Sequence, residues 1–167
     1  HQHLHVHAIP ADLDGAAQHV LHLAHAFARY LHADHVGLTG GDAALDLTAM
    51  PAVVFTDPQV ASVGRTAAQA ADEGLPHRVV EYPIGSIAGA SLFADGYEGT
   101  AIAVVDTERE VLLGVTFVGR GVAELLHSAT VAVVGEVPIA RLWHAVPSYP
   151  TMSEIWLRLL ETWRDGD

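Results

Sequence analysis

From residue 51 onward, short segments of apolar and mostly β-branched residues recur along the chain. Segments of this kind, bounded by glycine, proline and acidic residues, are typical of β-strands. The expected strands are 51–55 and 60–64 around the turn Asp57-Pro58, followed by 77–83, 100–107 and 110–119. Only Glu108 and Arg109 separate the last two strands, which is a hairpin spacing. The pattern therefore predicts an antiparallel sheet.

Helical segments accompany these strands. Thr66 is placed to cap a helix that runs to Glu73, with Gly74 as its stop. Further helices are expected over 121–134, over about 138–144, and over the terminal run TMSEIWLRLLETW at 151–163. Strands followed by helices predict an α+β fold, in which the helices pack on one side of the antiparallel sheet.

The beginning of the chain has a different pattern. Residues 1–9 read HQHLHVHAI, and alternating histidines at this spacing lie on one face of a strand. Pro10 would end such a strand. A run rich in alanine and leucine, without proline, then extends from about Asp12 to His35 and predicts a long helix.

A glycine-rich stretch, GLTGGDAALD at 37–46, marks the expected boundary between these two patterns. We therefore predict a strand and a helix over residues 1–47 and a separate domain over residues 48–167. The chain of 167 residues is long enough to bury a core without disulfides or metals.

Composition narrows the classes of function. Half of the residues are apolar and 17% are charged, so part of the apolar surface is expected to face a partner subunit. The formal net charge of -12 would repel phosphate backbones and anionic lipid, so neither nucleic acid nor a membrane surface is an expected partner. Cysteine is absent, which excludes a disulfide and a redox-active dithiol within this sequence. No run of about 18 apolar residues occurs, and we expect a cytoplasmic location.

Three motifs carry a resemblance to a known family. They are FTDPQVASVGRTAAQA at 55–70, GVTFVGRGVAELLHSATVAVV at 114–134 and PSYPTMSEIW at 147–156. In this order they resemble the C-terminal dimerisation domain of the FAD-dependent pyridine nucleotide-disulfide oxidoreductases, such as dihydrolipoamide dehydrogenases and glutathione reductases. The resemblance covers roughly residues 48–165. It implies a homodimer in which the same patch is used on both subunits.

A fainter resemblance lies upstream, where HVHAIPADLDG is similar to the family segment Y-A-x-G-D-x-x-G. The resemblance implies that Asp12 would bind the ribityl chain of FAD. The family's glycine is replaced here by Pro10 and Ala11, and proline removes a backbone donor. Alternatively, Asp12 and Asp14 are carboxylates at a helix start that interact with the helix dipole.

No G-x-G-x-x-G occurs in the sequence, and so no dinucleotide-binding turn is expected. We therefore expect no cofactor in this chain, and FAD and NAD(P) only where a longer parent or a partner chain supplies the missing domains.

In the family, the motif H-P-T-x-S-E reaches across the dimer, with the histidine as acid-base catalyst and the glutamate orienting it. This sequence has Tyr149 at the position of the histidine, followed by Pro150 and ending at Glu154. A phenol is a poor general base near neutral pH, but it can donate a hydrogen bond or a proton. His144 lies five residues before Tyr149 and could supply an imidazole. Thr151 and Glu154 also satisfy the capping box T-x-x-E, which explains both residues without catalysis.

Nine of the 12 histidines fall within the first 35 residues. Some of them have the spacing of metal ligands, but an affinity-tag-like terminus or a polar helix face explains them equally well. We assign no metal ligand.

Two functions from different classes remain open. The first is a dimerisation domain without redox activity of its own, which supplies one wall of an active site through Tyr149, Pro150 and Glu154. The second is a repurposed domain that performs cofactor-free acid-base chemistry of the isomerase or cyclase type. It would bind a small molecule in an interface cleft where Tyr149, Glu154 and His144 converge.

Overall fold

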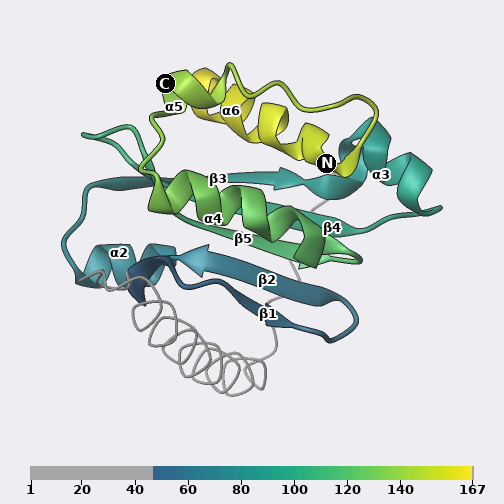
Figure 1. The fold of residues 1–167 in the computed structure, drawn as a ribbon, viewed down its shortest axis with the longest axis horizontal. Coiled ribbons are helices and arrows are strands. Elements are labelled where there is room, and N and C mark those ends of the chain that lie inside the picture. Colours follow the sequence, from purple (N-terminus) through teal and green to yellow (C-terminus); the bar gives the residue numbers. More distant parts are fainter. Residues whose placement is uncertain (1–46, 167) are drawn as a thin grey trace, which may run out of the picture.

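The computed structural model describes residues 47–166, which form an antiparallel sheet flanked by helices (Figure 1). The sheet has five strands in the order β1-β2-β5-β4-β3. They are β1 (Ala52–Val54), β2 (Gln59–Gly64), β3 (His77–Pro83), β4 (Gly99–Asp106) and β5 (Leu112–Gly119). Each strand lies within a few residues of its predicted position, and the predicted α+β class is confirmed.

The sheet core combines one large side chain with small neighbours. Phe117 in the central strand β5 is directly opposite Ala61 in β2 and Ala101 in β4. All three side chains are fully buried. Because the two alanines leave space on either side of the ring, Phe117 can fill the helix-facing side of the sheet at high packing density.

The predicted hairpin joins β4 and β5. Its turn is organised by the buried Asp106, whose Oδ1 accepts hydrogen bonds from the backbone N–H groups of Glu108 and Arg109, each at 2.9 Å. A register shift between Val104 and Val105 leaves Leu113 as an extra residue in β5. Such a bulge turns the extra side chain to the other face of the sheet.

Helix α2 (Ala67–Asp72) covers that other face. Thr66 forms the predicted cap, and a full capping box is present because Gln69 bonds back to it. Ala70 of α2 packs against Val104 and Leu113. The prediction placed helices on one side of the sheet and did not include this contact.

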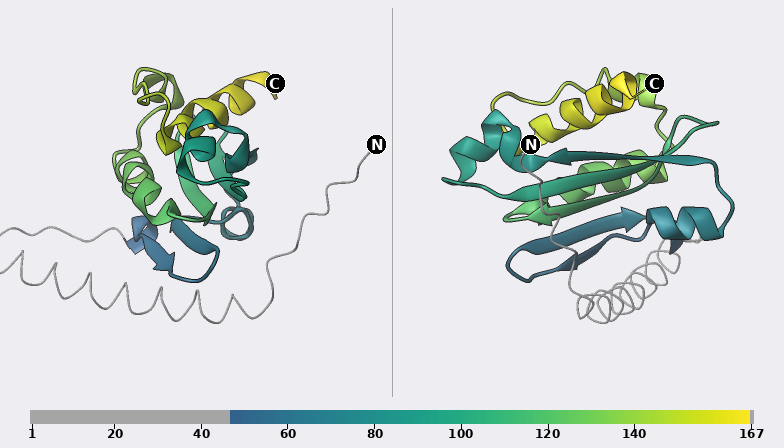
Figure 2. Two further views of the ribbon diagram at one scale, coloured as in Figure 1. Left: turned by 90° about the vertical axis from the view of Figure 1, so that its right-hand side faces the viewer. Right: turned by 180° about the vertical axis from the view of Figure 1, so that it is seen from behind.

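The helices and 3-10 turns that follow β5 form a layer on the opposite face (Figure 2). They are η3 (Val122–Leu125), α4 (Leu126–Val134), α5 (Ile139–Leu142), η4 (Met152–Glu154) and α6 (Ile155–Asp165). Helix α4 packs over β2 and β5, whereas α6 packs over β3 and β4. This layer confirms the predicted helices, each of the two longest being preceded by a 3-10 turn.

Sequence reasoning assigned no element between residues 84 and 99, where the structure has η2 (Ile84–Ser86) and α3 (Ala88–Phe93). The segment contains four glycines and no recognisable cap, and neither element has a side-chain cap hydrogen bond. A further 3-10 turn, η1 (Leu47–Ala49), precedes the sheet. Among the described residues, none of the helices has the length and apolar character needed to cross a bilayer. The predicted strand and helix of residues 1–47, and the boundary after them, lie essentially outside the described residues and stay predictions.

Candidate functional site

The start of α6 brings the motif P-T-M-S-E against α3. Glu154 is only 3% exposed, and its Oε2 accepts a hydrogen bond from the backbone N–H of Ala88 at 3.1 Å. Its other oxygen pairs with Nη2 of Arg158 at 3.0 Å. Arg158 also pairs with Glu161 through Nη1 at 2.9 Å. A buried carboxylate requires such donors, since leaving it unpaired would cost several kcal/mol.

The charge of the clamp formed by Glu154, Arg158 and Glu161 is fixed by these contacts. Hydrogen bonds to Glu161 and then to Glu154 hold the pKa of Arg158 above its usual value. Arg158 therefore keeps its charge at any ordinary pH and holds Glu154 as its partner. In this position Glu154 joins α3 to α6 across the edge of the sheet.

Gly89 permits the same contact from the side of α3. A Cβ atom at Gly89 would lie 2.1 Å from the carbonyl carbon and oxygen of Thr151. Only glycine allows the backbone of α3 to approach the motif so closely. The Ala88–Phe93 helix and the P-T-M-S-E segment therefore form one unit.

The predicted T-x-x-E capping box is not formed. The hydroxyl of Thr151 donates to the carbonyl oxygen of Ser148 at 2.6 Å, and no side chain caps η4. The physical reason is that Glu154 is turned toward Ala88 and Arg158 and so is not available to the backbone N–H of Thr151. This correction leaves the glutamate with a structural role that its spacing did not indicate.

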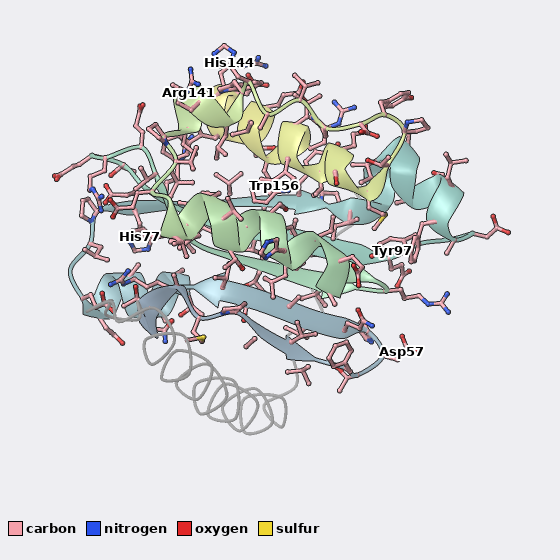
Figure 3. All side chains as sticks on the ribbon, viewed as in Figure 1. Asp57, His77, Tyr97, Arg141, His144 and Trp156 are labelled. Carbon is pink, nitrogen blue, oxygen red and sulfur yellow. The ribbon has the colours of Figure 1, made fainter. Side chains whose placement is uncertain are left out.

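Tyr149 and His144 lie at the surface. Tyr149 is 74% exposed, and His144 is exposed beside α5, near Arg141 in Figure 3. Glu154, in contrast, is buried against α3. The two pockets formed around Phe93 and around Tyr82 have none of these three predicted catalytic residues in their walls. Neither of these two pockets therefore joins the three residues, and their catalytic roles stay predictions.

Tryptophans anchor α6 and its neighbours to the core. Trp156 stands edge-on to Phe117, with ring centroids 6.0 Å apart, and its Nε1 donates to Ser128 at 3.0 Å. Arg78 lies over the ring of Trp163, 3.7 Å from its centroid. These contacts fix the position of α6, and with it the orientation of the exposed Tyr149 segment.

Within the described residues, no group of three or more His, Asp or Glu side chains is placed to hold a metal ion. The histidine-rich start and Asp12, the predicted FAD contact, lie outside those residues. Nothing in the structure therefore addresses either of them.

Sequence reasoning missed one further site. A pocket of about 460 Å³ lies where the β1–β2 turn, the end of α3 and the β5–η3 corner meet. Its walls include Phe93 and Arg120, which are far apart in the chain. The sequence did contain one signal of this site, the polar pair Arg120-Gly121 directly after a strand. Because α3 was not predicted, nothing indicated that Phe93 would lie beside this pair.

The match to known proteins covers the region just described. The sequence model of the pyridine nucleotide-disulphide oxidoreductase dimerisation domain matches residues 50–159. Dihydrolipoyl dehydrogenase of Chlamydia muridarum is 30% identical over 112 residues, which cover 67% of this chain and 24% of that protein. Leghemoglobin reductase of Glycine max is 36% identical over 120 residues, which cover 70% of this chain and 22% of that protein. Mercuric reductase of Shigella flexneri is 38% identical over 119 residues, which cover 71% of this chain and 21% of that protein.

Solved structures agree in fold. The Cu(II) complex of the HOCl-induced flavoprotein disulfide reductase RclA from Escherichia coli superposes with a TM-score of 0.63 at 26% identity, over 68% of this chain and 26% of that one. LpdA from Mycobacterium tuberculosis superposes with a TM-score of 0.68 at 22% identity, over 75% of this chain and 28% of that one. This likeness establishes the fold alone. The chain spans about a quarter of the length of the relatives it matches. Their activities are properties of those longer proteins.

Proposed function

The chain belongs to the pyridine nucleotide-disulphide oxidoreductase family through its dimerisation domain, and from this premise we propose that it forms a homodimer through the outward face of α4. The observation that carries the proposal is that α4 is apolar on both of its sides. Leu126, Ala129 and Ala132 are buried on the sheet, while Val131 and Val134 on the other side are each 56% exposed. A helix that is apolar all round is normally covered on all sides.

A second copy is a suitable cover for this face. In a two-fold dimer the same patch meets itself, so the exposed valines of one α4 would pack on those of the other. The patch has few charges of its own, with the exposed His127 one turn and the exposed Glu124 about two turns before Val131. Burial of the valines would stabilise the dimer by about 1 to 2 kcal/mol for each side chain.

Sedimentation equilibrium tests the proposal. We expect the wild-type chain to dimerise at micromolar concentration. Val131→Glu should raise the dissociation constant at least tenfold, about 1.4 kcal/mol, because a charge would be buried in the interface. Val79→Glu is the matched control, since Val79 is an exposed valine of β3, a strand that α4 does not cover. A monomeric wild-type chain, or equal effects of the two substitutions, would contradict the proposal.

The second part of the proposed function concerns the exposed segment around Tyr149 and Pro150, which the buried Glu154 holds in place. This segment supplies one wall of an active site that it shares with the cofactor-binding parts of a longer protein. The span of about a quarter of its relatives supports this role, as does the lack of cysteine and of G-x-G-x-x-G in the sequence. The chain by itself would then bind no flavin and transfer no electrons from NAD(P)H to a disulfide.

Absorbance between about 350 and 500 nm after purification with added FAD tests the second part, together with NADH oxidation in the presence of a disulfide substrate. We expect neither a flavin spectrum nor turnover. Stoichiometric flavin binding would contradict it without affecting the dimer. Neither the pocket beside Phe93 nor the one beside Tyr82 includes Tyr149, Glu154 or His144, so these two pockets give the cofactor-free acid-base alternative no support. A cytoplasmic location remains a prediction from sequence.

A further inference from the structure

The pocket beside Phe93 has prearranged walls. Tyr97 is only 8% exposed, and its hydroxyl donates to the backbone oxygen of Arg120 at 2.8 Å. Phe93 stands edge-on to Tyr97 with ring centroids 5.7 Å apart. Burial raises the pKa of Tyr97, against the opposing effect of the Arg120 charge, so the phenol keeps the proton that it donates. The backbone of Arg120 and the ring of Phe93 are thus fixed by one buried tyrosine.

Gly121 completes this arrangement. Its φ of 70° is in the left-handed region, and a Cβ atom there would lie 2.6 Å from the ring of Phe93. Glycine therefore lets the β5–η3 corner turn directly beside the ring. Phe93 nevertheless remains 51% exposed, so that part of its surface is open to the pocket.

Arg120 differs from most other basic residues of the chain. All eight of them are arginines. In the part of the chain that the structure describes, four arginines form ion pairs with carboxylates, namely Arg65, Arg109, Arg158 and Arg164. Arg78 stacks on Trp163. Among the described residues, this leaves Arg120 and Arg141 as arginines whose guanidinium groups have no ion-pair partner.

Two further polar groups line the pocket. Gln59 accepts a hydrogen bond from the backbone N–H of Ala123 at 3.4 Å, which directs its side-chain oxygen to the protein and leaves its amide N–H groups as donors. Asp57, in the β1–β2 turn, contributes a carboxylate. The pocket therefore offers a cation, a neutral hydrogen-bond donor, an exposed aromatic ring, and one negatively charged hydrogen-bond acceptor.

We propose that this pocket binds a small aromatic carboxylate that carries a hydrogen-bond donor at its other end. The planar guanidinium of Arg120 would hold the carboxylate with two hydrogen bonds, aided by Gln59. The ligand ring would pack on Phe93, and its donor would face Asp57. A volume of about 460 Å³ is sufficient for such a molecule. Asp57 disfavours a second negative charge on the ligand.

Titration of the ¹⁵N-labelled chain with 4-hydroxyphenylacetate, followed by amide chemical shifts, tests the proposal. We expect saturable shifts around Phe93 and Gly121 with a Kd on the order of 1 mM, as is usual for a ligand of this size in an open pocket. 2-(4-Hydroxyphenyl)ethanol, which lacks the carboxylate, should bind at least tenfold more weakly. Cyclohexylacetate, which has a saturated ring in place of the aromatic one and lacks the donor, should also bind more weakly, by several fold.

Arg120→Gln should weaken binding of 4-hydroxyphenylacetate at least tenfold. Arg141→Gln is the matched control, because Arg141 is also unpaired but lies at the opposite side of the molecule from Asp57 (Figure 3). Phe93→Leu provides a second variant and should weaken binding several fold. Unsaturable shifts in the millimolar range, or equal losses in the Arg120 and Arg141 variants, would overturn the proposal, since they would indicate general attraction of anions.

Discussion

Thr66 to Gln69 and Thr151 to Glu154 have the same spacing of a threonine and a long polar residue at a helix start, yet only the first pair forms a capping box. In the first, the N–H of Gln69 donates to the hydroxyl of Thr66 at 3.2 Å, and the N–H of Thr66 donates to Gln69 Oε1 at 2.9 Å. In the second, Thr151 turns to Ser148 and Glu154 to Ala88.

The difference lies in what surrounds each helix start. The start of α2 is at the surface, so the local partners have no competitors other than water. The start of α6 lies against α3, where Glu154 is buried and the Ala88 N–H and Arg158 are nearby. A buried carboxylate binds the strongest donors within reach, and a cationic guanidinium forms a stronger hydrogen bond with it than a backbone amide does. Tertiary contact therefore decides the role of a residue whose local pattern is ambiguous.

The largest effect should come from removing the buried carboxylate. Glu154→Ala leaves the Ala88 N–H without its acceptor and Arg158 without its buried partner, and we expect a loss of about 3 kcal/mol in the free energy of unfolding. Glu154→Gln, which keeps an acceptor but not the charge, should lose less. Urea denaturation monitored by tryptophan fluorescence measures both values.

Glu161→Ala is the control for this pair. It removes the other carboxylate bound to Arg158, but that side chain is 33% exposed, so the loss should be below about 1 kcal/mol. If Glu154→Ala cost no more than Glu161→Ala, the buried clamp would not be what distinguishes the two helix starts.

A smaller effect is expected at Gly89. Gly89→Ala forces a methyl group into the backbone of Thr151, and separation of α3 from the motif should cost about 2 kcal/mol. Ser91→Ala is the control on the same helix, because Ser91 is exposed and alanine suits a helix. The same denaturation curves compare the two. Equal stability of these variants would mean that α3 can move away from the motif at no cost.

The elements of the sheet could be predicted because each strand has a local signature, such as the β-branched segments on either side of Glu108 and Arg109. The cap at Thr66 could be predicted for the same reason. α3 could not, because its stability comes from packing of Gly89 and Ala90 on other parts of the fold and not from caps or periodicity. The contact between Glu154 and α3 escaped prediction because its donor, the Ala88 N–H, belongs to that unpredicted helix.

The pocket beside Phe93 was missed for a related reason. Its walls come from the β1–β2 turn, the end of α3 and the β5–η3 corner, and their proximity depends on the strand order, in which β2 and β5 are neighbours although they are far apart in the chain. The predicted roles of Tyr149 and Glu154 came from the resemblance to the family motif H-P-T-x-S-E, and that of His144 from its position five residues before Tyr149. In the structure Glu154 is buried, whereas Tyr149 and His144 are exposed, and their catalytic roles stay predictions.

The smallest effects should come from the two threonines, and they test the comparison most directly. Thr66→Ala removes a cap from an exposed helix start and should cost about 1 kcal/mol. Thr151→Ala removes only a bond to the exposed Ser148 carbonyl, which water can replace, so its cost should be below about 0.5 kcal/mol.

Double-mutant cycles sharpen the contrast. Thr66 and Gln69 should show a coupling energy of about 0.5 kcal/mol, whereas Thr151 and Glu154 should show none beyond error. Coupling of equal size in both pairs would mean that Thr151 and Glu154 do cap the helix in solution.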